Sequence, residues 1–259
     1  MMRSLLTSAT GMEAQQLNID TIANNLANVN TTAFKRSRAN FHDLLYQTLR
    51  APGQSATTGT VVPSGIQIGT GTKLSAVDKL FTEGSIQETG NDLDFMVAGD
   101  GFFRVQRDDG EIVYTRDGHF SKDNTGRIVT ADGFPLLPEI VIPQGAQNFH
   151  VGTDGTVTVK VAGETQEIGQ MQIADFINPA GLVSLGGNYF RPSKSSGDPV
   201  VGVPNQSGLG SIGQAQLESS NVDIVAEMVN MITGQRAYEI NSKVIQTGDQ
   251  MLQTTTNIR

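Results

Sequence analysis

The sequence predicts an α+β protein with a long helix near each terminus and an antiparallel all-β domain between them. Near both termini, apolar residues recur every three or four positions, as they do on one face of a helix. The middle consists instead of short runs in which apolar and polar residues alternate. Asp-Gly dipeptides of the kind that close β-hairpins separate these runs.

The first helix is expected in residues 1–34, as the N-terminal half of a coiled-coil domain. Its side chains step alternately by four and three, which indicates a heptad-like seam, and Leu6, Ile22 and Val29 form a second row beside it. The same spacing is typical of an amphipathic helix packed on its own domain, so that interpretation stays open. The expected seam residues are Leu5, Ala9, Met12, Gln16, Ile19, Ala23, Leu26 and Asn30.

Residues 35–72 are expected to form a connecting segment with an extended β arm over 46–72. The arm is rich in Gly, Ser, Thr and Gln, a composition that is also typical of a flexible linker. Its apolar residues at 61–62 and 66–68 give it enough β character to order as an arm. The basic run KRSR at 35–38 follows the first helix, where positive charge complements the helix dipole.

The central β domain is expected over residues 73–216. Strong hairpin signals lie at Asp109-Gly110, Asp117-Gly118 and Asp132-Gly133, and Thr125-Gly126 is a weaker one. No repeat of fixed period is visible in the sequence, so a solenoid or propeller is not predicted.

The second helix is expected in residues 217–259, as the other half of the coiled coil. The segment SNVD at 220–223 offers an N-cap, and Glu227 places a carboxylate near the helix start. About 35 residues then follow without proline, against ~11–12 for an average helix. The expected seam residues are Ile224, Met228, Met231, Gln235, Tyr238, Ser242, Ile245, Asp249 and Leu252.

Composition argues against several classes of protein. The net charge is −8, with 18 basic and 26 acidic residues, so a general nucleic-acid binder is not expected. The chain has no cysteine, which rules out disulfides and thiolate chemistry. No apolar run approaches the ~18 residues of a membrane span, and the first residues make a poor signal peptide. We therefore expect a cytoplasmic protein, or one exported without a cleaved signal.

Catalytic motifs are weak. GLGSIG at 208–213 matches the dinucleotide fingerprint as a string, but it does not open a helix in a βαβ unit. His42, His119 and His150 have no metal-ligand spacing, and the many carboxylates of the middle lie mainly on turns, where Asp is common anyway. We expect no enzyme, no catalytic residues, no cofactor and no metal.

Two long motifs at opposite ends resemble a known family. ANNLANVNTTAFKRSRANFHDLLYQT at 23–48 is similar to the N-terminal signature of bacterial flagellar rod and hook proteins, and LESSNVDIVAEMVNMITGQRAYEINSKVIQTGDQML at 217–252 to their C-terminal signature. GDGFFRV, YTRDGHF and TADGF resemble the family's central β domain. The arm is similar to that of distal-rod members. Ala33 and Ala215 stand where the family usually has glycine.

The resemblance implies a structural subunit that polymerises into a stiff, hollow helical drive shaft, which transmits torque from motor to hook. The implied location is the basal-body rod crossing the periplasm. The implied partners are further copies of the chain, proximal rod proteins, the hook protein, the P-ring and L-ring proteins, the rod cap and the type III export apparatus. A proximal rod or hook paralogue, or a secreted carbohydrate-active β domain, remains an alternative.

A polymer subunit explains why asparagine, a mediocre helix former, crowds residues 24–30. Asn24 and Asn28 lie four residues apart on one helix face, where their amides are expected to bond adjacent helices and set register. The residues expected to serve assembly are Leu5, Met12, Ile19, Asn24, Leu26, Asn28, Val29, Met228, Met231, Tyr238, Ile245 and Leu252, with arm contacts at Tyr46, Pro63, Ile66 and Ile68.

Overall fold

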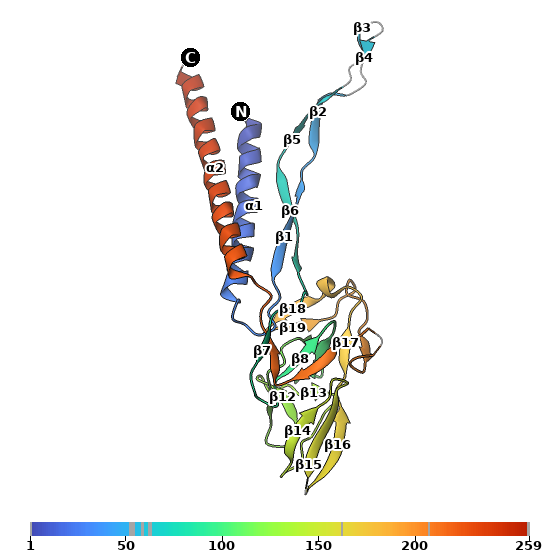
Figure 1. Ribbon diagram of the computed structural model, residues 1–259. Coiled ribbons are helices and arrows are strands. Elements are labelled where there is room, and N and C mark those ends of the chain that lie inside the picture. The colour runs from blue at the N-terminus through green and yellow to red at the C-terminus, as the bar shows by residue number, and fades with distance from the viewer. Residues whose placement is uncertain are drawn as a thin grey trace. The chain divides into compact units, whose positions relative to one another are not determined.

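The computed structural model describes residues 2–51, 55–57, 60–61, 64–161, 163–206 and 208–257 (Figure 1). They form an α+β protein of two units. Unit 1 comprises residues 1–27, 37–79 and 223–259, and unit 2 comprises residues 28–36 and 80–222. The boundary expected at residue 72 falls where a strand begins that belongs to unit 1. Each unit is therefore built from segments that lie far apart in the sequence.

The two expected helices are α1 (Met2–Ala27) and α2 (Ile224–Asn257), which lie side by side in unit 1 (Figure 1). They run antiparallel, because positions 5, 11 and 19 of α1 face positions 248, 241 and 234 of α2. A Cβ atom at Gly248 would lie 2.8 Å from Leu5 Cδ2, and one at Gly11 would lie 2.9 Å from Asn241 Nδ2. Glycines thus allow a close approach of the two helices.

The seam between the helices differs by one residue from the expected one at alternate positions. Of the expected seam residues, some are half-buried and the others, such as Ala9, Ile224, Met228 and Tyr238, are exposed. The half-buried ones are Leu5, Met12, Ile19, Leu26, Met231, Ser242, Ile245 and Leu252. The spacing placed Gln235 and Asp249 in the seam where close approach needs the neighbouring Gly234 and Gly248. It placed Met228 there where the neighbouring Glu227 makes a buried polar pair. The buried helix residues are Ser8, Ala14, Ile22 and Asn25 of α1 and Glu227, Gly234 and Gly248 of α2.

The start of α2 confirms the expected cap. The Asp223 carboxylate accepts hydrogen bonds from the backbone N–H groups of Val225 (2.9 Å) and Ala226 (3.2 Å). These N–H groups have no partner within the helix, so the cap satisfies them.

The connecting segment forms a ribbon of paired antiparallel strands in unit 1. It begins before the expected arm and ends after it, because the strand at 37–43 pairs with the strand at 72–79. The ribbon contains three antiparallel pairs. They are β1 (Ser37–Asp43) with β6 (Thr72–Lys79), β2 (Tyr46–Arg50) with β5 (Ile66–Gly69), and β3 (Ser55–Thr57) with β4 (Thr60–Val61).

Unit 2 is built on a seven-stranded antiparallel sheet of order β18-β19-β10-β9-β17-β20, with β13 also paired to β9. Its strands are β18 (Val183–Gly186), β19 (Tyr189–Arg191), β10 (Ile112–Thr115), β9 (Phe102–Gln106), β17 (Ile173–Asp175), β20 (Val200–Gly202) and β13 (Leu136–Leu137). A 3-10 turn, η1 (Pro179–Gly181), precedes β18.

Smaller sheets complete unit 2. They are β11 (Phe120–Lys122) with β12 (Ile128–Thr130), β14 (Gln147–Val151) with β15 (Thr156–Val161) and β16 (Glu164–Gln170), β8 (Phe95–Ala98) with β21 (Ser211–Gln214), and β7 (Ile86–Glu88) with β22 (Gln216–Glu218).

The large sheet buries apolar side chains on both faces, because successive residues of a strand point to opposite sides. On β9, Phe103 and Val105 join the larger core cluster, whereas Phe102 joins a smaller aromatic one. On β10, Val113 joins the larger core cluster and Tyr114 joins the smaller aromatic one.

Asp132-Gly133 reverses the chain after β12, with an antiparallel bridge between Val129 and Pro135. Two further hairpin signals close hairpins between paired strands. Asp109-Gly110 joins β9 to β10, and Thr125-Gly126 joins β11 to β12. Asp117-Gly118 instead leads from β10 to a strand of another sheet. Its glycine is needed for close packing, since a Cβ atom there would lie 1.6 Å from the carbonyl oxygen of Phe95.

Both alanines that replace a usual family glycine keep the left-handed conformation, with φ of 55° at Ala33 and 56° at Ala215. An L-residue pays about 1–2 kcal/mol for that conformation. We expect Ala215→Gly to raise the free energy of unfolding of unit 2 by about 0.5–1 kcal/mol, after the entropy that glycine gains in the unfolded chain. Urea unfolding measures this change. Ala131→Gly, at an exposed position without positive φ, is the control and should destabilise slightly.

Candidate assembly surface

The large apolar side chains that remain exposed gather in unit 1. They lie along both helices and on the strands of the ribbon, whereas unit 2 encloses most of its own in the two core clusters. Val225 of α2 is 72% exposed and Leu45 of the ribbon 88%. On the helices the exposed residues are Met2, Leu6, Leu17, Ile224, Val225, Met228, Val229, Ile232, Tyr238, Ile240, Val244 and Met251, and on the ribbon Leu45, Tyr46, Leu49, Ile66, Ile68 and Val77.

The residues expected to serve assembly fall into two groups. The first group is half-buried and, apart from Asn28 and Val29, lies on the helices: Leu5, Met12, Ile19, Leu26, Asn28, Val29, Met231, Ile245 and Leu252. The second group is exposed: Asn24, Met228 and Tyr238 on the helices, and Tyr46, Ile66 and Ile68 on the ribbon. Pro63 lies outside the described residues.

The ribbon exposes apolar side chains on a structure with little support of its own. All described side chains of β2 and β5 are exposed. An isolated two-stranded ribbon is marginally stable in water, and an exposed strand edge is a template for pairing with another chain. The ribbon is therefore suited to lie against a partner.

The most buried amide among residues 24–30 is neither Asn24 nor Asn28, which lies beyond the end of α1, but Asn25. Its side chain accepts from the Ser37 N–H (2.8 Å) and donates to the Ser37 carbonyl (2.8 Å) and to a Glu227 carboxylate oxygen (3.3 Å). This amide therefore links α1, β1 and α2 within unit 1. The sequence signal for this contact is a seven-residue spacing of small and polar residues on α2, at Glu227, Gly234 and Gly248.

A second set of buried polar groups holds the ends of unit 2 together. Lys35 Nζ donates to Glu218 Oε1 (2.5 Å) and to the Thr82 carbonyl (2.7 Å), and Arg116 Nε lies 3.7 Å from Glu218 Oε2. Burial lowers the pKa of Lys35, and Arg116 adds to this, while Glu218 and Glu83 oppose it. Lys35 does not act as an exposed charge at the end of a helix, as the KRSR run had indicated, because its side chain is fully buried.

Asn221 completes this junction. Its side chain accepts from the Arg36 N–H (2.7 Å) and donates to the Leu80 carbonyl (2.8 Å) and the Thr82 carbonyl (3.1 Å). Residues 35–36, 80–82 and 218–221 therefore form one hydrogen-bonded cluster in unit 2.

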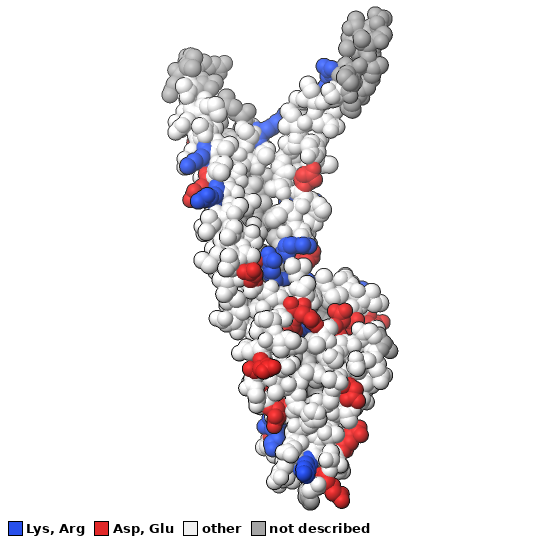
Figure 2. Space-filling model, in the orientation of Figure 1, with Lys and Arg blue, Asp and Glu red and all other residues white. Residues whose placement is uncertain are grey.

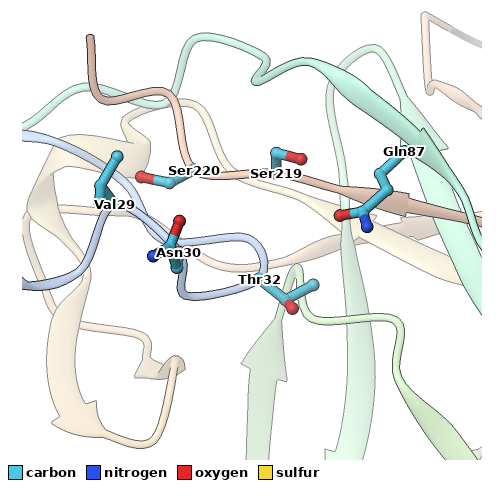
Figure 3. Close-up of a pocket in the computed structure, with 6 residues that line it drawn as sticks. All are labelled: Val29, Asn30, Thr32, Gln87, Ser219 and Ser220. Atoms are coloured by element: carbon cyan, nitrogen blue, oxygen red, sulfur yellow. The ribbon is translucent and has the colours of Figure 1, made fainter. Parts of the chain in front are cut away.

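A polar pocket of about 290 Å³ lies beside this cluster (Figure 3). The segment after α1, strand β7 and the residues after β22 all contribute to it. It offers hydroxyl and amide groups without an ionisable side chain, so it is suited to hydrogen bonding and not to acid–base chemistry. The lining residues are Val29, Asn30, Thr32, Gln87, Ser219 and Ser220.

Charge is divided unevenly between the units. Unit 1 contains eight basic and eight acidic residues, whereas unit 2 contains 10 and 18 and so carries the net charge of −8. Figure 2 shows few charged side chains on the helices and the ribbon. Among the described residues, no group of three or more acidic or histidine side chains could hold a metal ion, and no helix is long and apolar enough to cross a bilayer.

Family models match the chain in the segments that build both units. Residues 5–35 match a flagella basal body rod protein model, residues 96–159 the flagellar hook protein FlgE/F/G D1 domain, and residues 214–258 the flagellar basal body rod FlgEFG protein C-terminal model. The first and third matches cover most of α1 and α2, which bear the exposed apolar rows. The chain therefore belongs to the family of flagellar rod and hook proteins, as its sequence motifs indicated.

Several relatives match over their whole length. The flagellar basal-body rod protein FlgG of Buchnera aphidicola subsp. Schizaphis graminum is 48% identical over 98% of this chain and 98% of its own. FlgG of Borreliella burgdorferi is 47% identical over 100% and 99%. The flagellar hook-basal body complex protein FlhP of Bacillus subtilis is 32% identical over 100% of both chains. FlgG-type rod proteins are thus markedly more similar to this chain than that hook-basal body protein is.

Proposed function

We propose that this protein is the structural subunit of the flagellar distal rod. Copies of it assemble head to tail into a stiff, hollow helical shaft that transmits torque from motor to hook. The identity of 47–48% with FlgG rod proteins over nearly the whole chain supports this assignment. Members of the family are structural proteins. The lining of the polar pocket in unit 2 contains no acid–base pair.

The observation that carries the proposal is the set of apolar rows left exposed on α1, α2 and the ribbon. Exposed apolar surface of this extent is a mark of protein–protein interaction. A contact between two different faces of one subunit does not close on itself and so builds a helical polymer. The helices of each copy would then pack as coiled coils with those of neighbouring copies.

The proposal includes a location and partners. The rod crosses the periplasm, and the subunit reaches its tip through the flagellar type III export apparatus. Proximal rod proteins and the hook protein adjoin the polymer at its ends, the rod cap is a further partner, and the P-ring and L-ring proteins surround it. The ribbon lies along neighbouring copies and stiffens the shaft.

Electron microscopy of the purified protein at rising concentration tests the proposal. We expect straight tubes above a critical concentration and single particles below it. Discrete particles at every concentration, with unit 2 folded, would contradict assembly into a rod.

A further inference from the structure

A groove runs along α1 on its side toward strands β1 and β6. Two pockets of about 280 and 320 Å³ share Leu17 and Leu74 among their lining residues, so they form one continuous depression. Its lining combines these apolar side chains with polar ones and with Lys73. Its rim carries Glu13 and Asp20, which are exposed and seven residues apart. These are the two charged side chains of α1 beyond Arg3.

The outer face of α2 carries the complementary pattern. Arg236 follows the buried Gly234 by two residues, which places it about 200° around the helix, on the side away from the seam. Lys243 lies seven residues further on the same side, and both side chains are exposed. We call the exposed apolar residues beside them the outer row; they are Val229, Ile232, Ile240 and Val244.

The two acidic side chains of α1 and the two basic side chains of α2 have no ion-pair partner among the described residues. In the described part of the chain, none of Glu13, Asp20, Arg236 and Lys243 forms an ion pair. The register of the two helices explains why. Positions 11 and 19 of α1 face positions 241 and 234 of α2. Measured along the helix axes, Arg236 therefore lies at the height of Leu17, and Glu13 lies at a height between Arg236 and Lys243.

We propose that the groove receives the outer row of α2 from a second copy of the chain, with Glu13 paired to Lys243 and Asp20 to Arg236. The inference rests on the proposed function and specifies its subunit contact. The two acids and the two bases have the same seven-residue spacing, so one alignment satisfies both pairs at once. The apolar outer row then covers the apolar floor of the groove, which is exposed in the isolated chain.

The pairing also sets the offset between copies. In a polymer in which every copy points the same way, α1 of one copy and α2 of the next are antiparallel, as they are within one chain. Pairing Asp20 with Arg236 then shifts α2 by three or four residues from its intrachain register, which is about 5 Å along the helix. In this alignment Glu239 lies level with Leu17, next to Lys73 in the groove lining.

Disulfide trapping tests the register, since the chain has no cysteine of its own. Full-length Glu13→Cys is mixed with Lys243→Cys, or Asp20→Cys with Arg236→Cys, assembled and oxidised. Glu13→Cys with Arg236→Cys is the control, offset by seven residues or about 10 Å, which is too far for a disulfide. We expect at least tenfold more crosslinked dimer from the matched mixtures. Equal yields from matched and offset mixtures would overturn the proposal.

Charge reversal tests the pairing itself. The double variants Glu13→Lys/Asp20→Lys and Arg236→Glu/Lys243→Glu should each need a roughly tenfold higher concentration to assemble, whereas a one-to-one mixture should sediment like the wild type. Mixing restores opposite charges only between copies, so rescue excludes an effect within one chain. Glu164→Lys/Glu167→Lys on β16 is the control and should assemble normally.

The outcomes separate the two proposals. If the wild type assembles but the mixture does not, the proposed register is wrong and the rod assignment stands. If the wild type forms no polymer at any concentration, the assignment fails and the register fails with it.

Discussion

Glu218→Gln is expected to lower the free energy of unfolding of unit 2 by about 3–5 kcal/mol, because it removes a carboxylate that contacts two buried cations, Lys35 and Arg116. Glutamine keeps the shape of glutamate and can still accept from Lys35 and from the Gly84 N–H. The loss therefore reports charge and not volume. Urea unfolding, followed by near-ultraviolet circular dichroism of the aromatic side chains, measures it.

Two variants make this result specific. Lys35→Met leaves Arg116 and Glu218 as a neutral pair, so it should cost less than Glu218→Gln. Glu111→Gln removes an exposed carboxylate 3.8 Å from Arg191 and should cost less than about 0.5 kcal/mol. Equal losses from Glu218→Gln and Glu111→Gln would show that the buried cluster does not hold unit 2 together.

The same variant should respond to pH. Burial lowers the pKa of Lys35 in the folded chain below its ordinary value of 10.5, so between these two values the unfolded chain binds more protons. Stability contributed by this group therefore rises as pH rises through that interval. The Glu218 charge opposes this lowering of the Lys35 pKa. In Glu218→Gln the pKa of Lys35 in the folded chain is therefore lower still, and the interval begins at a lower pH. The deficit of Glu218→Gln should thus shrink as pH rises from neutrality toward the ordinary lysine value of 10.5.

Val229→Asp/Ile240→Asp is expected to abolish assembly while leaving the fold of the isolated chain intact. Both side chains are more than half exposed, so the change in unfolding free energy should stay within about 1 kcal/mol for the two together. In the polymer the same positions would place two unpaired carboxylates in a desolvated interface, which costs several kcal/mol per subunit. Sedimentation and circular dichroism measure the two effects separately.

The matched control for this variant is Val141→Asp, at a similarly exposed apolar position in unit 2. It should leave assembly unchanged. If it blocks assembly as strongly as Val229→Asp/Ile240→Asp, apolar exposure on the helices has no special part in polymerisation.

The helices and the β character of the middle could be predicted from sequence because both depend on local periodicity. The expected seam includes half-buried residues such as Ile19 and Ile245, but it leaves out Gly234 and Gly248, which contribute by being small, and Glu227, which contributes by meeting Asn25. The periodicity of apolar residues alone does not reveal positions that are buried because their residues are small or polar.

Other features depend on pairs that are distant in the chain. Lys35 and Glu218 are 183 residues apart, and no local pattern connects them. The order of strands in the seven-stranded sheet is likewise set by packing, which is why Asp117-Gly118 looked like a hairpin turn but joins two sheets. An alanine at 33, where the family usually has glycine, predicts the loss of an easy left-handed position after the helix, yet Ala33 keeps that conformation.

Methionine oxidation most directly tests whether the exposed helix faces are covered by other copies. Met228 and Met251 on α2 are each 51% exposed, whereas Met96 and Met171 lie in the core of unit 2 and serve as internal references. Oxidation by dilute peroxide follows exposure, and peptide mass spectrometry reads each site. We expect Met228 and Met251 to oxidise at least tenfold more slowly in the polymer than in the monomer, with the references slow in both. Equal rates at Met228 and Met251 in the two states would contradict this account.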